Sequence, residues 1–146
     1  MRLAVIGAGS FGTVLASIAL ANGHTVRLWC RTQAQADQIN QTGVNERFHP
    51  GLFLHDVLAT SDLDVAVSDA ELVVLSVPSK GMSEVCSKLS AFLPEGVGLV
   101  STTKGIQASG FLMMSEVIEQ ACPGHPVGVL SGPNLAAEIA KRHLTA

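Results

Sequence analysis

The sequence predicts an α/β domain, a doubly wound parallel sheet with helices on both faces. Short runs rich in β-branched residues alternate with segments of helical periodicity along all 146 residues, which is typical of right-handed β-α-β crossovers. The composition, 47% hydrophobic and only 14% charged, fits strands buried on both faces or a surface that another domain covers. The length corresponds to one domain, residues 1–146, with on the order of six strands.

The first three elements are expected to be a strand over residues 2–6, a helix over residues 10–22 and a strand over residues 25–30. Both strands are short apolar or alternating runs. Gly23 closes the helix between them, because glycine tolerates the left-handed conformation common at helix ends.

The second helix is expected to begin at Thr32. Gln35 stands three residues later, which is the spacing of a capping box, in which each side chain bonds the other residue's backbone N–H. Gly43 ends this helix. A loop is expected over residues 45–51, followed by a short strand over residues 57–60.

Ser61 is expected to open the third helix, with Asp64 again at the spacing of a capping box. The run LVVLSV, residues 72–77, is the clearest buried strand. The helix expected after it, residues 79–92, carries an apolar stripe made of Met82, Val85, Cys86 and Leu89.

The last part of the chain continues the alternation. A strand is expected over residues 98–103, a helix over residues 111–122 and a strand over residues 127–130. A final helix is expected over residues 134–142, with Pro133 near its first turn, where proline is well tolerated.

Three glycines separate the first strand from the first helix in the stretch VIGAGSFG. Gly7 allows a tight turn, Gly9 lets a pyrophosphate approach the backbone, and Gly12 lets the helix pack closely on the sheet. Free N–H groups and the positive end of the helix dipole would face the pyrophosphate. The order strand, glycines, helix, strand is the context that a dinucleotide-binding motif requires, so a Rossmann-type fold is predicted. The alternative is a purely structural turn.

The residue after the second strand indicates which dinucleotide is bound. An acidic residue about 20 positions past the glycines would bond the ribose hydroxyls of NAD, but Arg31 stands there. A guanidinium cannot accept a hydrogen bond, whereas it can bind a 2′-phosphate with charge-assisted bonds. NADP(H) is therefore the expected cofactor, with NAD(H) tolerated. The alternative is an exposed arginine without a ligand.

Three further stretches follow later strands: VPS at residues 77–79, STTKGI at 101–106 and SGPNLAAEI at 131–139. Each has an ordinary interpretation by itself, as a strand-ending proline, a solvated lysine and a Gly-Pro turn. The carboxyl ends of parallel strands meet at one edge of a sheet, which is where open α/β sheets place their ligands. The three stretches are thus expected to converge on one crevice with the glycines.

Several functional classes are disfavoured. The net charge of −3 and the lack of a basic stripe argue against nucleic-acid binding. Apolar spans fall short of the ~20 residues of a membrane helix, so a cytoplasmic protein without a membrane partner is expected. The cysteines lack a C-x-x-C spacing and are interpreted as reduced structural thiols, and the scattered histidines predict no metal site. The cysteines are Cys30, Cys86 and Cys122.

These motifs, in this order, resemble the bacterial-type NAD(P)-dependent glycerol-3-phosphate dehydrogenases over the whole chain. The resemblance is carried by GAGSFGTVLA at residues 7–16, VPS at 77–79, TKGI at 103–106 and SGPNLAAE at 131–138. One stretch departs from it. Where the family usually reads closer to N-x-x-Y-L-P-G, this chain reads NERFHPG, so that Phe48 and His49 replace tyrosine and leucine.

The resemblance implies a role for individual residues. Ser10 and Phe11 would contact the cofactor diphosphate, Phe48 would pack beside the cofactor, and Lys104 would serve cofactor and substrate. Gly132 and Asn134 would meet glycerol 3-phosphate, and Ala136 would border the nicotinamide. The implied substrate-binding residues are Lys104, Gly132 and Asn134. The cofactor-binding residues expected from the motifs and the resemblance are Gly7, Gly9, Ser10, Phe11, Gly12, Arg31, Phe48, Pro78, Lys104 and Ala136.

The resemblance also implies the reaction: reversible hydride transfer between NAD(P)H and dihydroxyacetone phosphate, giving sn-glycerol 3-phosphate for phospholipid synthesis. The family's acid/base lysine lies in a second, helical domain, within a stretch similar to G-x-x-K-N that these residues lack. The chain is therefore expected to be the cofactor-binding domain, inactive alone, of an enzyme that dimerises through the other domain. No catalytic residue is assigned within it. The alternatives are a ketopantoate reductase, a hydroxyacid dehydrogenase or a non-enzymatic nucleotide sensor.

Overall fold

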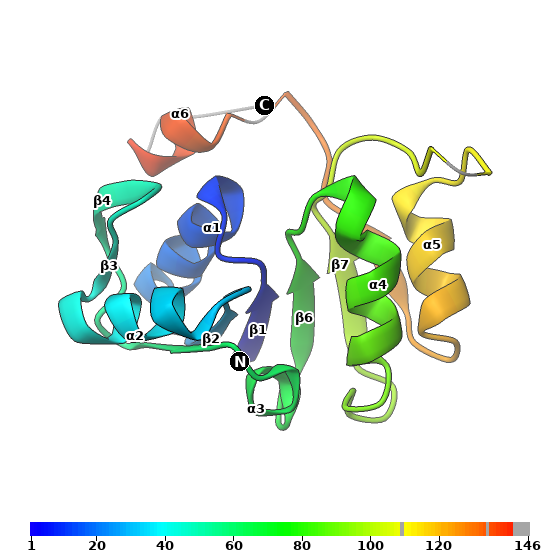
Figure 1. The fold of residues 1–146 in the computed structure, drawn as a ribbon, viewed down its shortest axis with the longest axis horizontal. Coiled ribbons are helices and arrows are strands. Elements are labelled where there is room, and N and C mark those ends of the chain that lie inside the picture. The colour runs from blue at the N-terminus through cyan, green and yellow to red at the C-terminus, as the bar shows by residue number, and fades with distance from the viewer. Residues whose placement is uncertain (109, 134, 142–146) are drawn as a thin grey trace.

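The computed structural model, which describes residues 1–108, 110–133 and 135–141, contains a six-stranded sheet in the order β5-β2-β1-β6-β7-β8 (Figure 1). All neighbouring strands in it are parallel. The strands are β1 (Arg2–Ile6), β2 (Thr25–Trp29), β5 (Val57–Thr60), β6 (Leu72–Leu75), β7 (Gly98–Ser101) and β8 (Val127–Val129). This strand order is that of a Rossmann-type fold, which confirms the predicted fold class.

Helices cover both faces of the sheet. They are α1 (Ser10–Ala21), α2 (Gln33–Thr42), α3 (Leu63–Val67), α4 (Ser79–Leu89), α5 (Met114–Ala121) and α6 (Ala136–Ala140). Val5 and Val74 pack with α1 and α2 on one face of the sheet. Ile6 and Val73 pack with α3, α4 and α5 on the other face. Successive strand residues thus point to opposite layers, and both layers are apolar. None of the helices among the described residues is long and apolar enough to cross a membrane.

A two-stranded antiparallel hairpin stands apart from the main sheet, formed by β3 (Val44–Asn45) and β4 (His49–Phe53). The sequence predicted only a loop over residues 45–51, so this prediction was wrong. Strand β3 has only two residues, and β4 contains Pro50 and Gly51 and shows no alternating pattern. A side chain rather than a pattern anchors the hairpin, because Asn45 is fully buried against the start of α1.

Two predicted caps differ from the structure. The Thr32 hydroxyl accepts from the Gln35 N–H at 3.4 Å, as predicted, but the Gln35 side chain donates to the carbonyl of Ala8 instead of completing the box. The third helix is capped by Asp62 and not by Ser61. The Asp62 carboxylate accepts from the N–H of Asp64 at 2.9 Å, while the Ser61 hydroxyl bonds Gln33.

Several other helices and strands are shorter than predicted. Helix α4 ends at Leu89, and α5 begins at Met114 because Phe111 has a positive φ of 54° and Met113 forms a bridge with Ile106. The strands β6 and β7 end two residues earlier than predicted, at Leu75 and Ser101. The predicted start of the last helix, Asn134, lies outside the described residues.

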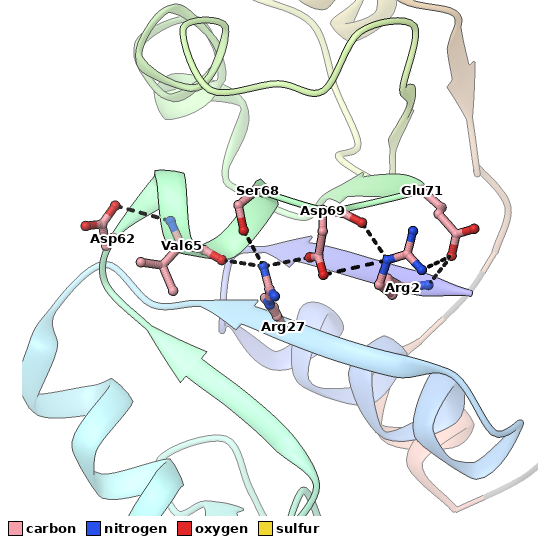
Figure 2. Close-up of polar contacts among 7 residues, drawn as sticks. All are labelled: Arg2, Arg27, Asp62, Val65, Ser68, Asp69 and Glu71. Carbon is pink, nitrogen blue, oxygen red and sulfur yellow. Dashed lines mark hydrogen bonds and ion pairs between the residues drawn. The ribbon is translucent and has the colours of Figure 1, made fainter.

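An ion network fixes the amino edge of the sheet (Figure 2). The Arg27 guanidinium on β2 donates to the carbonyl of Val65 at 2.9 Å and to the Ser68 hydroxyl at 2.7 Å, and it pairs with Asp69 at 2.7 Å. Arg2 donates through Nε to the Asp69 carbonyl and through its backbone N–H to Glu71. The backbone N–H of Arg2, and then the Arg2 charge, hold the pKa of Glu71 below its usual range. The network ties the segment between α3 and β6 to both β1 and β2.

The network gives a stability prediction. We expect Arg27→Met to lower the free energy of unfolding by about 1–2 kcal/mol, because two donated hydrogen bonds and an ion pair are lost from one partly buried side chain. Arg2→Met is the matched control. Its side chain is 51% exposed, so we expect a loss below about 1 kcal/mol. Urea denaturation measures both variants, and an equal or larger loss for Arg2→Met would contradict the assignment.

Candidate functional site

The loops that follow the parallel strands gather at one edge of the sheet. In Figure 1 the arrows of β1 and β6 point to the top of the view, and α6 lies at that end. Hydrogen bonds join the loops there: Thr102 N–H donates to the Leu75 carbonyl at 2.9 Å, and the Thr103 hydroxyl donates to the Val77 carbonyl at 2.6 Å. Helix α6 packs against α1. The described parts of these stretches thus lie at the carboxyl edge with the glycines, and the crevice expected between them stays a prediction.

Two of the three glycines in the β1–α1 loop, Gly7 and Gly12, have the steric roles that the sequence predicted. Gly7 has a φ of +119°, and a Cβ on it would overlap the Ser76 carbonyl oxygen. A Cβ on Gly12 would overlap the carbonyl oxygen of Gly7, so α1 approaches the loop as closely as backbone allows. At Gly9 a Cβ would meet no atom within 4 Å. Packing therefore explains two of the glycines but not Gly9, which faces open space.

The first turn of α1 offers unpaired backbone donors. Thr13 is the first residue of the turn whose N–H finds an acceptor, the Gly9 carbonyl at 3.0 Å. Among the described residues, none accepts from the N–H groups of residues 10–12. The helix has no side-chain cap and no acidic residue in its first turn. Free N–H groups, the positive end of a 12-residue helix and an uncrowded glycine fit the anionic diphosphate of a dinucleotide.

Side chains hold the other side of the same loop. The Ala8 carbonyl accepts from Gln35 Nε2 at 2.9 Å and from Asn45 Nδ2 at 3.0 Å. The Thr13 hydroxyl donates to the Gly9 carbonyl at 2.7 Å. No motif in the sequence predicts a site role for Gln35, Asn45 or Thr13. The only signal for Asn45 was its place at the start of the NERFHPG stretch.

The other residues predicted for the diphosphate lie at the same loop. Ser10 and Phe11 begin α1 and are half-buried. The Ser10 hydroxyl lies 2.8 Å from Nε2 of His49 on β4. Phe48 is in the turn of the hairpin, 37% exposed, with the Arg47 guanidinium 5.3 Å from its ring centre. The structure thus brings His49, one of the two residues in NERFHPG that depart from the usual family pattern, to the first residue of α1.

The predicted cofactor and substrate residues beyond the loop are spread along the carboxyl edge. Arg31 is exposed just after β2 and forms no ion pair with the described residues. Pro78 precedes α4 and Lys104 follows β7, and both are exposed. Gly132 is half-buried and Ala136 begins α6, whereas Asn134 lies outside the described residues. Their contacts with a ligand stay predictions.

Thiol and metal chemistry have little support at this edge. All three cysteines are free and buried, and burial raises the pKa of the Cys30 thiol to about 12, so that it is not a nucleophile near neutral pH. Within residues 1–108, 110–133 and 135–141, no cluster of three or more histidine, cysteine or carboxylate side chains could hold a metal ion. What the edge does offer is hydrogen-bond donors and exposed cations.

Comparisons with known proteins agree with this chemistry. The family model described as the NAD-dependent glycerol-3-phosphate dehydrogenase N-terminus matches residues 2–146. The chain is 44% identical to the glycerol-3-phosphate dehydrogenase (NAD(P)+) of Teredinibacter turnerae, over 99% of this chain and 43% of that protein. It is 47% identical to the enzyme of the same name from Azotobacter vinelandii, over 99% and 42%.

A solved structure is similar as well. The glycerol-3-phosphate dehydrogenase of Coxiella burnetii superposes with a TM-score of 0.89 at 30% identity, covering 96% of this chain and 43% of that one. The chain thus spans less than half the length of the relatives it matches.

The glycines give a prediction that separates binding from folding. Gly9→Ala adds a methyl group where no protein atom is within 4 Å, so we expect an unchanged melting temperature but at least about tenfold weaker NADPH binding, because the methyl group occupies the approach to the backbone donors. Gly12→Ala forces the new atom against Gly7, so we expect a loss of stability of about 1–3 kcal/mol. Fluorescence titration and thermal melting measure the two effects. Undiminished binding by Gly9→Ala would contradict this interpretation of the site.

Proposed function

We propose that this chain, which belongs to the family of NAD-dependent glycerol-3-phosphate dehydrogenases, binds NADP(H) in preference to NAD(H), because Arg31 stands after the second strand where an acidic residue would bond the ribose of NAD. We propose further that its enzyme catalyses reversible hydride transfer between this cofactor and dihydroxyacetone phosphate, which gives sn-glycerol 3-phosphate for phospholipid synthesis in the cytoplasm. The observation that carries the proposal is the β1–α1 loop, where unpaired N–H groups surround an unobstructed glycine at a helix terminus without acidic residues.

The cofactor would lie across the carboxyl edge. The N–H groups of residues 10–12 and the Ser10 hydroxyl would donate to the diphosphate, beside Phe11. Arg31, exposed one strand away from the glycine loop, would bind the 2′-phosphate with charge-assisted hydrogen bonds. Pro78, Phe48 and Ala136 would border the rest of the cofactor, with Ala136 next to the nicotinamide.

The substrate would bind beside the nicotinamide. When bound, the cofactor supplies the hydride chemistry, and the protein contributes orientation and electrostatics. The Lys104 ammonium, exposed after β7, suits a phosphate or hydroxyl oxygen of the substrate. Gly132 and Asn134 would meet the same molecule. No described residue is assigned as the general acid that ketone reduction needs.

The cofactor preference is tested at Arg31. We expect the chain to bind NADPH more tightly than NADH at low salt, and we expect Arg31→Gln to weaken NADPH binding about tenfold while changing NADH binding little, since only NADPH carries the 2′-phosphate. Arg2→Met, at the opposite edge of the sheet, is the control and should leave both affinities unchanged. Fluorescence titration measures them, and equal or tighter NADH binding by the unsubstituted chain would contradict the preference.

The substrate role is tested at Lys104 in the complete polypeptide that carries this sequence. Lys104→Ala should lower kcat/KM for dihydroxyacetone phosphate by about 10- to 100-fold, because a cation facing the substrate is lost. Lys88→Met is the control, since Lys88 is exposed and paired with Glu84 on α4. The rate of NADPH consumption measures both variants. Unchanged kinetics for Lys104→Ala would remove this lysine from the site.

A further inference from the structure

The β3–β4 hairpin touches the glycine loop through two side chains that face each other across its strands. Asn45 and His49 are register partners, and neighbouring side chains of such a pair lie on one face of an antiparallel ladder. Asn45 Nδ2 donates to the Ala8 carbonyl at 3.0 Å and to the Thr13 hydroxyl at 2.9 Å. His49 Nε2 lies 2.8 Å from the Ser10 hydroxyl. Both residues thus contact the loop predicted to bind the diphosphate.

Asn45 is an unusual residue for its surroundings. It is fully buried, and its Oδ1 atom has no hydrogen-bond partner among the described residues. A buried unpaired acceptor is unfavourable, and leucine would fill a similar volume without one. What leucine lacks is the amide donor. The contacts that this donor makes, to Ala8 and Thr13, are what distinguish asparagine from an apolar residue here.

The hydrogen bonds to the loop carbonyls determine where the loop's N–H groups point. In a trans peptide the C=O and the following N–H point in opposite directions, and the described chain contains no cis peptide. The Ala8 carbonyl is fixed by Asn45 and Gln35, so the N–H of Gly9 is directed away from them. The Gly9 carbonyl is held by the Thr13 hydroxyl and N–H, which directs the N–H of Ser10 in the same manner.

His49 acts on Ser10, whose hydroxyl can donate to a phosphate oxygen, whereas the Thr13 hydroxyl already donates to the Gly9 carbonyl. A hydroxyl has a single proton. If the Ser10 hydroxyl donates this proton to the imidazole, it cannot donate a hydrogen bond to the ligand. An imidazole that donates through Nε2–H to Ser10 Oγ leaves the proton of the hydroxyl directed toward the ligand, and the 2.8 Å contact allows this arrangement.

We propose that Asn45 and His49 are positioning residues for the diphosphate of the bound dinucleotide. Asn45 fixes the peptide planes of the glycine loop, and His49, as the Nε2–H tautomer, orients the Ser10 hydroxyl. This inference rests on the proposed function, since it needs a diphosphate at the loop. It adds two residues from outside the glycine motif to the binding site.

Four forms of the chain test the proposal: the unsubstituted chain, His49→Leu, His49→Gln and Asn45→Leu. The probes are NADPH and 2′-AMP, which carries the adenosine 2′-phosphate but no diphosphate. Calorimetric titration gives both affinities, and thermal melting without ligand reports the fold. The amide nitrogen of glutamine can take the place of the histidine Nε2–H donor, so His49→Gln is the conservative rescue.

We expect His49→Leu and Asn45→Leu each to weaken NADPH binding about three- to tenfold, the effect of one hydrogen bond. His49→Gln should restore NADPH affinity to within about twofold of the unsubstituted chain. Binding of 2′-AMP should stay unchanged in all four forms. The melting temperature of Asn45→Leu should change little, because the loss of two donated hydrogen bonds is offset by removal of the buried, unpaired Oδ1 atom.

Three results would overturn the proposal: NADPH affinity unchanged in both leucine variants, His49→Gln no better than His49→Leu, or equal losses for NADPH and 2′-AMP, which would indicate general damage to the fold. Each of these leaves the proposed function intact so long as the unsubstituted chain binds NADPH. An unsubstituted chain that binds no NADPH would instead contradict the proposed function, and this inference with it.

Discussion

The structure depends on the close approach of two backbone segments at the β1–α1 turn. The carbonyl of Gly7 lies where a Cβ of Gly12 would be, and the carbonyl of Ser76 lies where a Cβ of Gly7 would be. This contact sets how near α1 lies to the sheet and brings the turn against the end of β6. It also directs the start of α1 to the carboxyl edge, where its unpaired N–H groups are available to a ligand. Side chains larger than hydrogen at these two positions would move all three segments.

The topology makes this turn the centre of the site. Strand β1 lies in the middle of the sheet, with β2 and β5 on one side and β6, β7 and β8 on the other. The chain therefore reverses its direction of winding beside β1, and in open α/β sheets such a point is where ligands bind. Arg31 follows β2 on one side, while Pro78 and Lys104 follow β6 and β7 on the other. The ion network of Arg2, Arg27, Asp69 and Glu71 stabilises the opposite, amino edge.

Much of the fold could be predicted from the sequence, because its signals are local. The bounds of β1 and the positive φ of Gly23 and Gly43 follow from an apolar run and from glycine at helix ends. The hairpin could not be predicted, since β3 has only two residues, β4 contains a proline and a glycine, and a buried tertiary contact of Asn45 anchors the pair. The predicted bond between the Gln35 side chain and the Thr32 backbone N–H does not form, because the Gln35 side chain donates instead to the Ala8 carbonyl, which is distant in sequence. The glycines of the site were predictable from spacing, whereas the residues that hold the loop from behind were not.

Amide NMR of the isotope-labelled chain during titration with NADPH shows whether the backbone N–H groups at the start of α1 bind the diphosphate of a dinucleotide. We expect the amide resonances of Gly9, Ser10, Phe11 and Gly12 to shift most and their hydrogen exchange to slow, because each N–H gains an acceptor. Amide signals of these four residues that stay in place while NADPH saturates the chain would contradict diphosphate binding at the start of α1.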